Sequence, residues 1–277
     1  MKKPHVPTVS AGLPASFVLY LAVSAAAAFF FFPVLMMAAA SFKTRLDLYA
    51  GAARFFSFNP TAAVWKDLLA HPAWPLYLAN SLIVSLATTI VSMFFGTLAA
   101  YALARFRLPL LEKLTFFILL TRMLPPIVMA LPLFLLMKSA GLLDSRTGVI
   151  VAHTAFNLPF VIWMMREFIR ALPAELEEAA MVDGLSRLQA FRRVLLPLLR
   201  PSLVAVSIFC LVFSYSEFLL AFILTQNSAK TLTVFIAELG WHQASAAGTA
   251  FLLPMLVFGL VVQKHLLRGL SFGAVSR

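Results

Sequence analysis

Residues 68–104 read LLAHPAWPLYLANSLIVSLATTIVSMFFGTLAAYALA and contain no Asp, Glu, Lys or Arg. An α-helix rises about 1.5 Å per residue, so about 20 apolar residues are enough to cross the hydrocarbon core of a bilayer. This run therefore holds one complete membrane span, which we place at residues 78–103. Its apolar side chains must contact lipid or another helix, so the run indicates an integral membrane protein.

The composition of the whole chain agrees with this interpretation. Of its 277 residues, 62% are hydrophobic and 12% are charged, whereas soluble domains have about 45–50% apolar and about 25% charged residues. A net charge of +11 is compatible with nucleic-acid binding. However, the basic residues gather at the ends of the apolar runs, where the positive-inside rule places them. We therefore expect no nucleic-acid partner.

Further apolar runs on either side of this segment predict an all-α integral membrane fold with six transmembrane helices. Residues 4–42 lack charged side chains and exceed the about 7–15 apolar residues of a cleavable secretory signal, so we expect a retained first span. Residues 1–277 show no internal repeat and no linker, which predicts a single transmembrane domain. The six spans are predicted at about residues 14–40, 78–103, 114–137, 147–165, 202–224 and 246–263.

The distribution of Lys and Arg predicts the orientation of these spans. If the N-terminus is cytoplasmic, the cytoplasmic ends of the spans carry about twice as many Lys and Arg residues as the opposite ends. Both termini and the strongly charged loop at residues 166–200 are then cytoplasmic.

The loop at residues 166–200 predicts two short helices. Glu175 and Glu177 complement the positive N-terminal end of a helix dipole, and Gly184 can end that helix in a left-handed conformation. A second short helix is predicted over residues 186–195, because its apolar residues recur at helical spacing. These apolar residues are Leu188, Phe191, Val194 and Leu195.

Periodicity alone leaves two interpretations of this helix–turn–helix. It could lie against the lipid headgroups with Arg187, Arg192 and Arg193 contacting phosphate. Alternatively, it could form a compact and rigid projection to which another protein binds. The spacing of individual residues favours the second interpretation.

The order Glu178-Ala179-Ala180, Gly184, Val194 and Leu196-Pro197 resembles the EAA motif of binding-protein-dependent ABC importer permeases. In that family the loop docks into a cleft on the ATP-binding subunit and transmits its closure to the membrane helices. Val194 departs from the pattern, since the family more often has Ile there, but the two side chains have similar volumes. The resemblance implies that the docking residues are Glu178, Ala179, Ala180, Asp183, Gly184, Phe191, Leu196 and Pro197.

The resemblance extends over nearly the whole chain. Segments such as Gly96–Phe106, Gly141–Asp144 and Glu217–Leu220 are similar to carbohydrate-type permeases related to the smaller maltose-system permease. This similarity implies a six-helix permease of the bacterial inner membrane that translocates a sugar, an oligosaccharide or a polyol. It also implies as partners a second homologous permease, two ATP-binding subunits and an extracytoplasmic solute-binding protein.

No Gly-x-x-x-x-Gly-Lys-Ser/Thr pattern occurs in the sequence, so we expect this chain to lack a P-loop for ATP. ATP and Mg²⁺ would be held by the partner ATPase subunits, and no cofactor or metal is expected in this chain. The sequence also lacks the His-Glu-x-x-His and Gly-x-Ser-x-Gly patterns of enzymes. An ion-coupled secondary transporter remains the alternative, although the internal symmetry of that class is absent.

Four polar side chains inside the predicted spans are candidates for the translocation path. Arg122 and Glu217 are ionisable, and such groups cost at least about 2.5–3.5 kcal/mol in the hydrocarbon zone, which makes them functional candidates. They could form an ion pair, face a wet path, or occupy separate solvated positions. His153 and Asn157 share one helix face; they could pack inside the protein or line the path of a hydroxyl-rich solute.

Two further patterns concern helix packing. Pro125, Pro126 and Pro132 interrupt the third span, which makes this span a candidate for lining the path. Small side chains recur every three or four residues along the second span, which lets another helix approach closely. These small residues are Ser81, Ser85, Thr88, Ser92 and Gly96.

Overall fold

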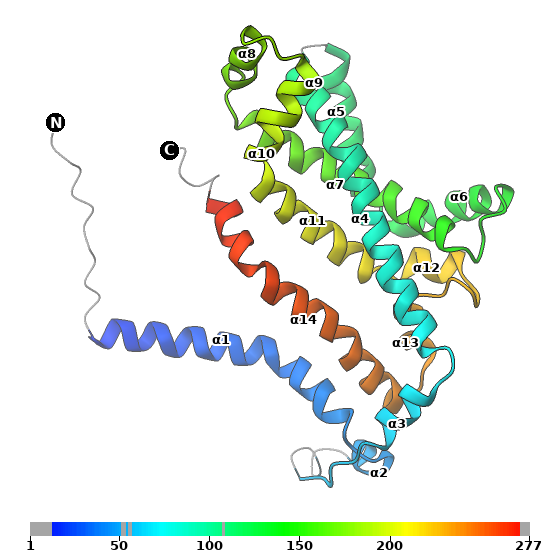
Figure 1. Ribbon diagram of the computed structural model, residues 1–277. Helices are drawn as coiled ribbons and strands as arrows, with labels where there is room; N and C mark the ends of the chain where they lie inside the picture. The colour runs from blue at the N-terminus through cyan, green and yellow to red at the C-terminus, as the bar shows by residue number, and fades with distance from the viewer. Residues whose placement is uncertain (1–12, 51–53, 55–56, 107–108, 272–277) are drawn as a thin grey trace. The chain divides into compact units, whose positions relative to one another are not determined.

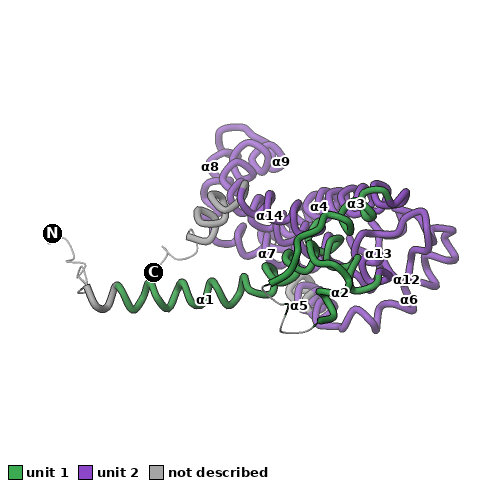
Figure 2. The backbone as a smooth tube through the Cα atoms, turned by 90° about the horizontal axis from the view of Figure 1, so that it is seen from below, with its two compact units in different colours: residues 1–70, 240–250 green, residues 71–239, 251–277 purple. Residues whose placement is uncertain are grey.

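The computed structural model describes the chain except for residues 1–12, 51–53, 55–56, 107–108 and 272–277 (Figure 1). Every regular element in the described residues is helical, which confirms the all-α expectation. The chain divides into two compact units, residues 1–70 with 240–250 and residues 71–239 with 251–277 (Figure 2).

The first unit contains α1 (Leu13–Ala40), α2 (Arg45–Tyr49), α3 (Ala63–Ala70) and the start of α14 (Trp241–Ser271). The Asp47 carboxylate of α2 accepts a hydrogen bond from Thr44 at 2.8 Å and pairs with Arg54 at 2.8 Å. The hydrogen bond from Thr44, supported by the Arg54 guanidinium, lowers the pKa of Asp47 below its usual value.

The second unit contains the remaining helices and the rest of α14. In chain order they are α4 (Trp74–Arg105), α5 (Pro109–Met123), α6 (Pro126–Ser139), α7 (Arg146–Arg170), α8 (Glu175–Val182), α9 (Arg187–Ala190), the π-helical turn η2 (Phe191–Leu195), α10 (Leu196–Leu198), α11 (Arg200–Tyr215), α12 (Leu219–Leu224) and α13 (Leu232–Glu238).

Four helical segments of the described chain are long and apolar enough to cross a membrane: Phe17–Ala40, Trp74–Arg105, Arg146–Arg170 and Trp241–Leu260. Two bent helix pairs raise the number to six if each pair is one span. Lys113–Met123 and Pro126–Ser139 meet at 98°, whereas Arg187–Leu198 and Arg200–Tyr215 meet at 76°.

Prolines explain both bends. Pro125 and Pro126 follow the end of α5, and a residue that precedes proline is driven away from helical dihedrals. Pro197 and Pro201 flank the second bend and lack the N–H that would continue the helix. The predicted third span, residues 114–137, is therefore divided between α5 and α6.

The helices α4 and α7 form the core of the second unit and run parallel. At one end Arg146 Nε donates to Asn80 Oδ1 at 2.7 Å, and at the other Arg105 Nη2 donates to the Leu172 carbonyl at 3.1 Å. Between these ends, a Cβ added to Gly96 would lie 2.5 Å from Val161 Cγ1. Gly96 therefore permits the close approach that the stripe of small residues predicted.

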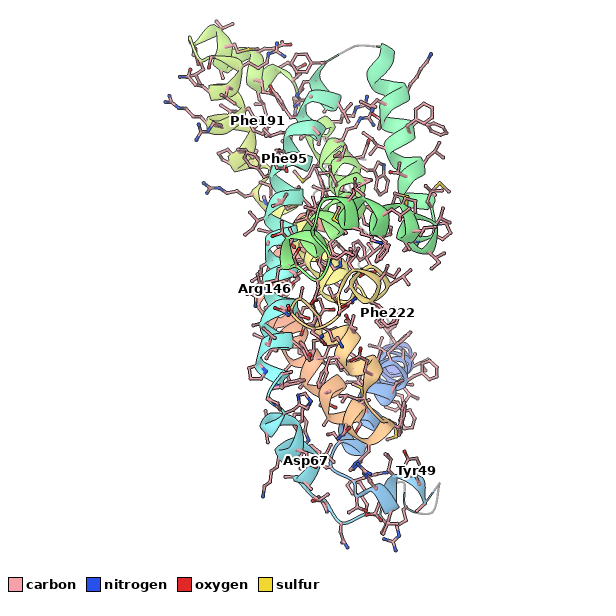
Figure 3. The ribbon with its side chains drawn as sticks, turned by 90° about the vertical axis from the view of Figure 1, so that its right-hand side faces the viewer. Tyr49, Asp67, Phe95, Arg146, Phe191 and Phe222 are labelled. Carbon is pink, nitrogen blue, oxygen red and sulfur yellow. The ribbon has the colours of Figure 1, made fainter. Side chains whose placement is uncertain are left out.

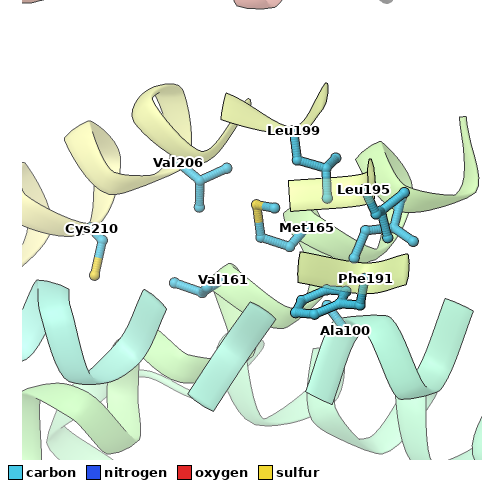
Figure 4. Close-up of a cluster of buried hydrophobic side chains, with 9 residues drawn as sticks. Ala100, Val161, Met165, Phe191, Leu195, Leu199, Val206 and Cys210 are labelled. Carbon is cyan, nitrogen blue, oxygen red and sulfur yellow. The ribbon is translucent and has the colours of Figure 1, made fainter. Parts of the chain in front are cut away.

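A cluster of buried apolar side chains joins the turn η2 to the membrane helices (Figure 4). Because lipid is as apolar as these side chains, their close packing and not their transfer from water holds the helices together. The cluster draws on α4, α7, η2 and α11, so the second short helix of the loop is anchored to three long helices. Its members are Ala100, Val161, Met165, Ile169, Phe191, Leu195, Leu199, Val206 and Cys210.

Candidate functional site

The helices α8, α9 and α10 and the turn η2 form a small projection at the C-terminal ends of α4 and α7 (Figure 1). We call this projection, residues 175–198, the knob. It coincides with the helix–turn–helix that the sequence predicted. In Figure 3, Phe191 of the knob lies closer to the C-terminal end of α4 than Arg146 of α7 does.

The first helix of the knob is encoded by its own residues. Its first turn carries Glu175, Glu177 and Glu178, which favour the positive end of the helix dipole. At its other end the Leu185 N–H donates to the Ala180 carbonyl at 3.1 Å, and the Gly184 N–H donates to the Met181 carbonyl at 3.1 Å. Gly184 has a φ of +90°, so this end is a Schellman motif, for which glycine is the favoured residue.

The second helix of the knob begins with a capping box. Ser186 Oγ accepts from the Gln189 N–H at 3.3 Å, and Gln189 Oε1 accepts from the Ser186 N–H at 2.8 Å. The helix then widens into the π-helical turn, in which the Leu196 N–H donates to the Phe191 carbonyl. Pro197 follows directly, and its missing N–H and bulky ring account for this widening.

The predicted docking residues fall into an outer and an inner group. Ala180 and Phe191 are only 7% and 4% exposed, so they support the knob from inside. Leu196 and Pro197 are half-buried. The outer group, which a partner could contact directly, is Glu178, Ala179, Asp183 and Gly184.

Two apolar side chains of the knob are exposed. Val182 is 87% exposed and Leu188 is 61% exposed. Leu188 was expected on the buried face of the second helix, but only Phe191 and Leu195 of that set are buried. Exposed apolar side chains beside Glu178 and Asp183 enlarge the surface that a partner protein could cover.

Glu177 points inward and binds α4, in contrast to its exposed neighbour Glu178. Glu177 Oε1 accepts from Arg105 Nε at 2.5 Å, and Glu177 Oε2 accepts from the Tyr101 hydroxyl at 2.7 Å. The side chains of Arg105 and Glu177 are 11% and 6% exposed. The sequence indicated Glu177 only as a partner of the helix dipole. The available signal for this contact was the spacing of Tyr101 and Arg105, which lie four residues apart and share one face of α4.

A polar site, formed by His153, Ser214 and Glu217, lies where α11 ends. His153 of α7 places Nδ1 2.9 Å from Ser214 Oγ and Nε2 3.1 Å from Glu217 Oε2. Glu217 also accepts from the Leu220 N–H at 2.8 Å and the Ala221 N–H at 3.1 Å, so its carboxylate caps α12. The predicted fifth span, residues 202–224, is accordingly interrupted between Tyr215 and Leu219.

Arg122 lies against aromatic rings. Its guanidinium carbon is 4.5 Å from the ring centre of Phe156 and 4.9 Å from that of Phe213, and Nη1 donates to the Phe156 carbonyl at 3.2 Å. Cation–π contacts of this kind offset part of the cost of a cation in the membrane. Among the side chains that the structure describes, Glu217 contacts His153 and not Arg122.

Asn157 is only 2% exposed and lies one helical turn beyond His153 on α7. Its Oδ1 has no hydrogen-bond partner among the described residues, and the same holds for the hydroxyl of Thr88 on α4. Val161, which Gly96 of α4 contacts, lies one helical turn after Asn157 on α7. Buried polar atoms with free hydrogen-bonding capacity therefore occur on both α4 and α7.

A third carboxylate, Asp144, joins two loops. It precedes α7 and accepts hydrogen bonds of 2.9–3.1 Å from the backbone N–H groups of residues 226–229. Burial raises the pKa of Asp144, but the four hydrogen bonds outweigh this effect and lower the pKa to about 2. Asp144 therefore anchors the loop between α12 and α13.

Comparison with known families identifies the class of protein. The family model described as "Binding-protein-dependent transport system inner membrane component" matches residues 92–271. This range includes the knob and the polar site around His153 and Glu217. The chain belongs to this family. It is therefore a permease, a non-catalytic membrane subunit of a transport system.

Curated relatives of the permease include sugar transporters. It is 38% identical to the trehalose transport system permease protein SugB of Mycobacterium tuberculosis, over 72% of this chain and 76% of that protein. It is 32% identical to the diacetylchitobiose uptake system permease protein DasC of Streptomyces coelicolor, over 86% of this chain and 89% of that protein.

The fold of the permease is that of a solved transporter. A crystal structure of a bacterial ABC transporter involved in the import of the acidic polysaccharide alginate contains a chain that aligns with a TM-score of 0.75 and 22% identity. The alignment covers 90% of this chain and 95% of that one. This similarity confirms the predicted permease fold.

Proposed function

We propose that the permease is one of two homologous membrane subunits of an ATP-driven importer in the bacterial inner membrane. The solute is a sugar, an oligosaccharide or a polyol, in keeping with relatives named for trehalose and diacetylchitobiose. The observation that carries the proposal is the knob, a capped projection with Glu178 exposed on its first helix. Two ATP-binding subunits, which hold ATP and Mg²⁺, grip the cytoplasmic knobs of the two permeases.

The knob is built to transmit force. Both of its helices have fixed ends, the first at Gly184 and the second at Ser186, and we propose that it moves as a rigid body. Phe191 and Leu195 insert into the cluster formed by α4, α7 and α11. Closure of the ATPase subunits therefore moves these helices and switches the path between inward and outward access, while an extracytoplasmic binding protein delivers the solute.

The polar site supplies the chemistry for a hydroxyl-rich solute. His153, Asn157 and Glu217 together present an imidazole, an amide and a carboxylate near the end of α11. Asn157 Oδ1 has free hydrogen-bonding capacity, which suits weak and reversible contacts with hydroxyl groups. Arg122 of α5, stacked on Phe156 of α7, adds a cation on a neighbouring helix.

An ion-coupled secondary transporter is the second candidate, and the buried His153–Glu217 pair favours it, because such pairs occur in proton relays. Two features weigh against it. Glu217 is already engaged as the cap of α12, and the permease belongs to a binding-protein-dependent family. We therefore retain the ATP-driven importer.

The test is retention of the ATPase subunits and ATP-driven uptake in proteoliposomes that hold the co-purified complex. Glu178→Arg reverses the charge at the expected contact, and we expect the variant to insert normally but to lose at least about tenfold in ATPase-subunit retention, as for a lost interfacial charge pair. Lys138→Glu, an exposed reversal at the end of α6, is the control and should retain the subunits. Uptake that is driven by an ion gradient without ATPase subunits would contradict the proposal.

A further inference from the structure

We propose that Glu177 is a positioning residue that clamps the knob to α4 and thereby makes α4 the helix that carries knob movement across the membrane. This inference rests on the proposed function, because it names the route by which ATPase closure reaches the solute path. The clamp consists of Glu177, Tyr101 and Arg105.

The geometry fixes the position of the first knob helix. Each carboxylate oxygen of Glu177 is bound by a different side chain, Oε1 by Arg105 and Oε2 by Tyr101. The two donors lie four residues apart and project from one face of α4. A carboxylate held at both oxygens can neither rotate nor slide along α4, so α8 keeps its orientation when the knob is pulled.

Burial makes this attachment strong. The Arg105 and Glu177 side chains are almost fully enclosed, so water cannot replace either partner when the pair separates. Removal of one charge would leave the other buried and uncompensated. Arg105 also donates to the Leu172 carbonyl at 3.1 Å, which ties the turn between α7 and α8 to the same point.

The two neighbouring glutamates of α8 have separate tasks. Successive residues of a helix point about 100° apart, so Glu178 faces solvent while Glu177 faces α4. A partner that pulls on the outer face therefore acts through α8 on the clamp. The docking residues that the EAA resemblance implies include Glu178 and not Glu177, whereas the contact with α4 depends on Glu177.

Other contacts of the knob reach the same end of α4. The rings of Phe191 and Tyr101 are 4.6 Å apart, and the Arg187 guanidinium lies 5.2 Å from the ring centre of Phe106. The turn η2 and the helix α9 are thus also attached at the C-terminal end of α4. The clamp is distinguished by its two hydrogen bonds to a buried charge.

The helix α4 extends from the clamp to the loop before α13. Asn80 Nδ2 donates to the carbonyls of Ser228 and Lys230 at 3.0 and 2.9 Å, and Ser81 Oγ accepts from the Leu232 N–H at 2.7 Å. Twenty residues of helix separate Ser81 from Tyr101, a length of about 30 Å. A single rigid helix therefore connects the knob to the loop that Asp144 anchors.

The test measures the number of solute molecules imported per ATP hydrolysed, in proteoliposomes that hold the complete complex. Glu177→Gln keeps the shape of the side chain but removes its charge. Tyr101→Phe removes one hydrogen bond and no charge. Glu175→Gln, the same change at an exposed position of the same helix, is the matched control.

We expect Glu177→Gln to retain the ATPase subunits and to hydrolyse ATP, while uptake per ATP falls about threefold to tenfold, which lies within the range for residues of a coupling network. Tyr101→Phe should show a smaller fall, and Glu175→Gln should match the native chain. If the ratio of uptake to ATP hydrolysis stays native in both variants, even where both rates decline, the clamp is only structural and the inference is overturned. A native complex that fails to couple uptake to ATP would instead contradict the proposed function.

Discussion

Glu177 and Glu217 are two glutamates of the same unit that serve different ends of the bundle. Glu177 is bound by Arg105 and Tyr101, two side chains of one continuous helix. Glu217 is bound by His153 of another helix and by N–H groups in the first turn of α12. It lies in the interruption between the helices α11 and α12.

The difference between these two sites shows how one residue type can either fix or interrupt a structure. An Arg side chain stays protonated throughout the accessible pH range, and both donors to Glu177 project from one continuous helix. The Glu177 clamp is therefore permanent and suits a joint that must not yield. The Glu217 site joins segments that meet at a break, which suits a place where helices change their relative positions.

The largest expected effect is that of Arg105→Ala. This change leaves the Glu177 carboxylate buried without a counter-charge, and we expect it to lower the free energy of unfolding by about 3–5 kcal/mol. Thermal unfolding in detergent measures it. Adding Glu177→Gln to Arg105→Ala should restore part of the loss. A cost below about 1 kcal/mol, as for exposed ion pairs, would show that the clamp is not the buried pair described above.

A smaller effect is expected for Glu217→Gln. The amide oxygen can still accept one N–H at the start of α12, but the charge that faces His153 is lost, so we expect a cost of about 1–3 kcal/mol. Glu167→Gln is the control, because Glu167 is 52% exposed in its pair with Arg166 and should cost less than about 1 kcal/mol. Equal costs in the two variants would remove the distinction between the Glu217 site and an ordinary surface pair.

The smallest effect is expected for Asp144→Asn, which extends the comparison to a carboxylate held by backbone N–H groups alone. The folded-state pKa of about 2 lies below the ordinary value. The stabilisation by Asp144 is therefore complete above about pH 4 and is lost as the pH falls through about 2. The variant should be less stable than the native chain at pH 7, and this difference should shrink between pH 4 and pH 2 in thermal unfolding. A difference that stays constant with pH would contradict this reading.

The sequence predicted the elements whose signals are local. Both helices of the knob were predicted within a few residues, the first from its acidic first turn and Gly184, and the second from the helical spacing of its apolar residues. The bend between α5 and α6 likewise follows from Pro125 and Pro126. The close approach of α4 and α7 was encoded in the stripe that contains Gly96.

Contacts between distant residues could not be predicted in this way. Glu177 lies 72 and 76 residues from its partners on α4, and no local pattern specifies such a pairing. The sequence left open whether Arg122 pairs with Glu217; in the structure His153 occupies that position and Arg122 stacks on aromatic rings. The break before α12 contains no proline and depends on Glu217 as a cap, which only the folded chain reveals.

The central claim is that the knob and α4 move as one body, and a distance measurement between spin labels tests it most directly. Replacement of the single cysteine, Cys210, by Ala permits labels at Glu175 on α8 and Phe94 on α4, both of which are exposed. In the complete complex we expect the distance distribution between these labels to be the same without nucleotide and with ATP bound. A shift of several ångströms on ATP binding would show that the knob swivels independently of α4 and would contradict the account.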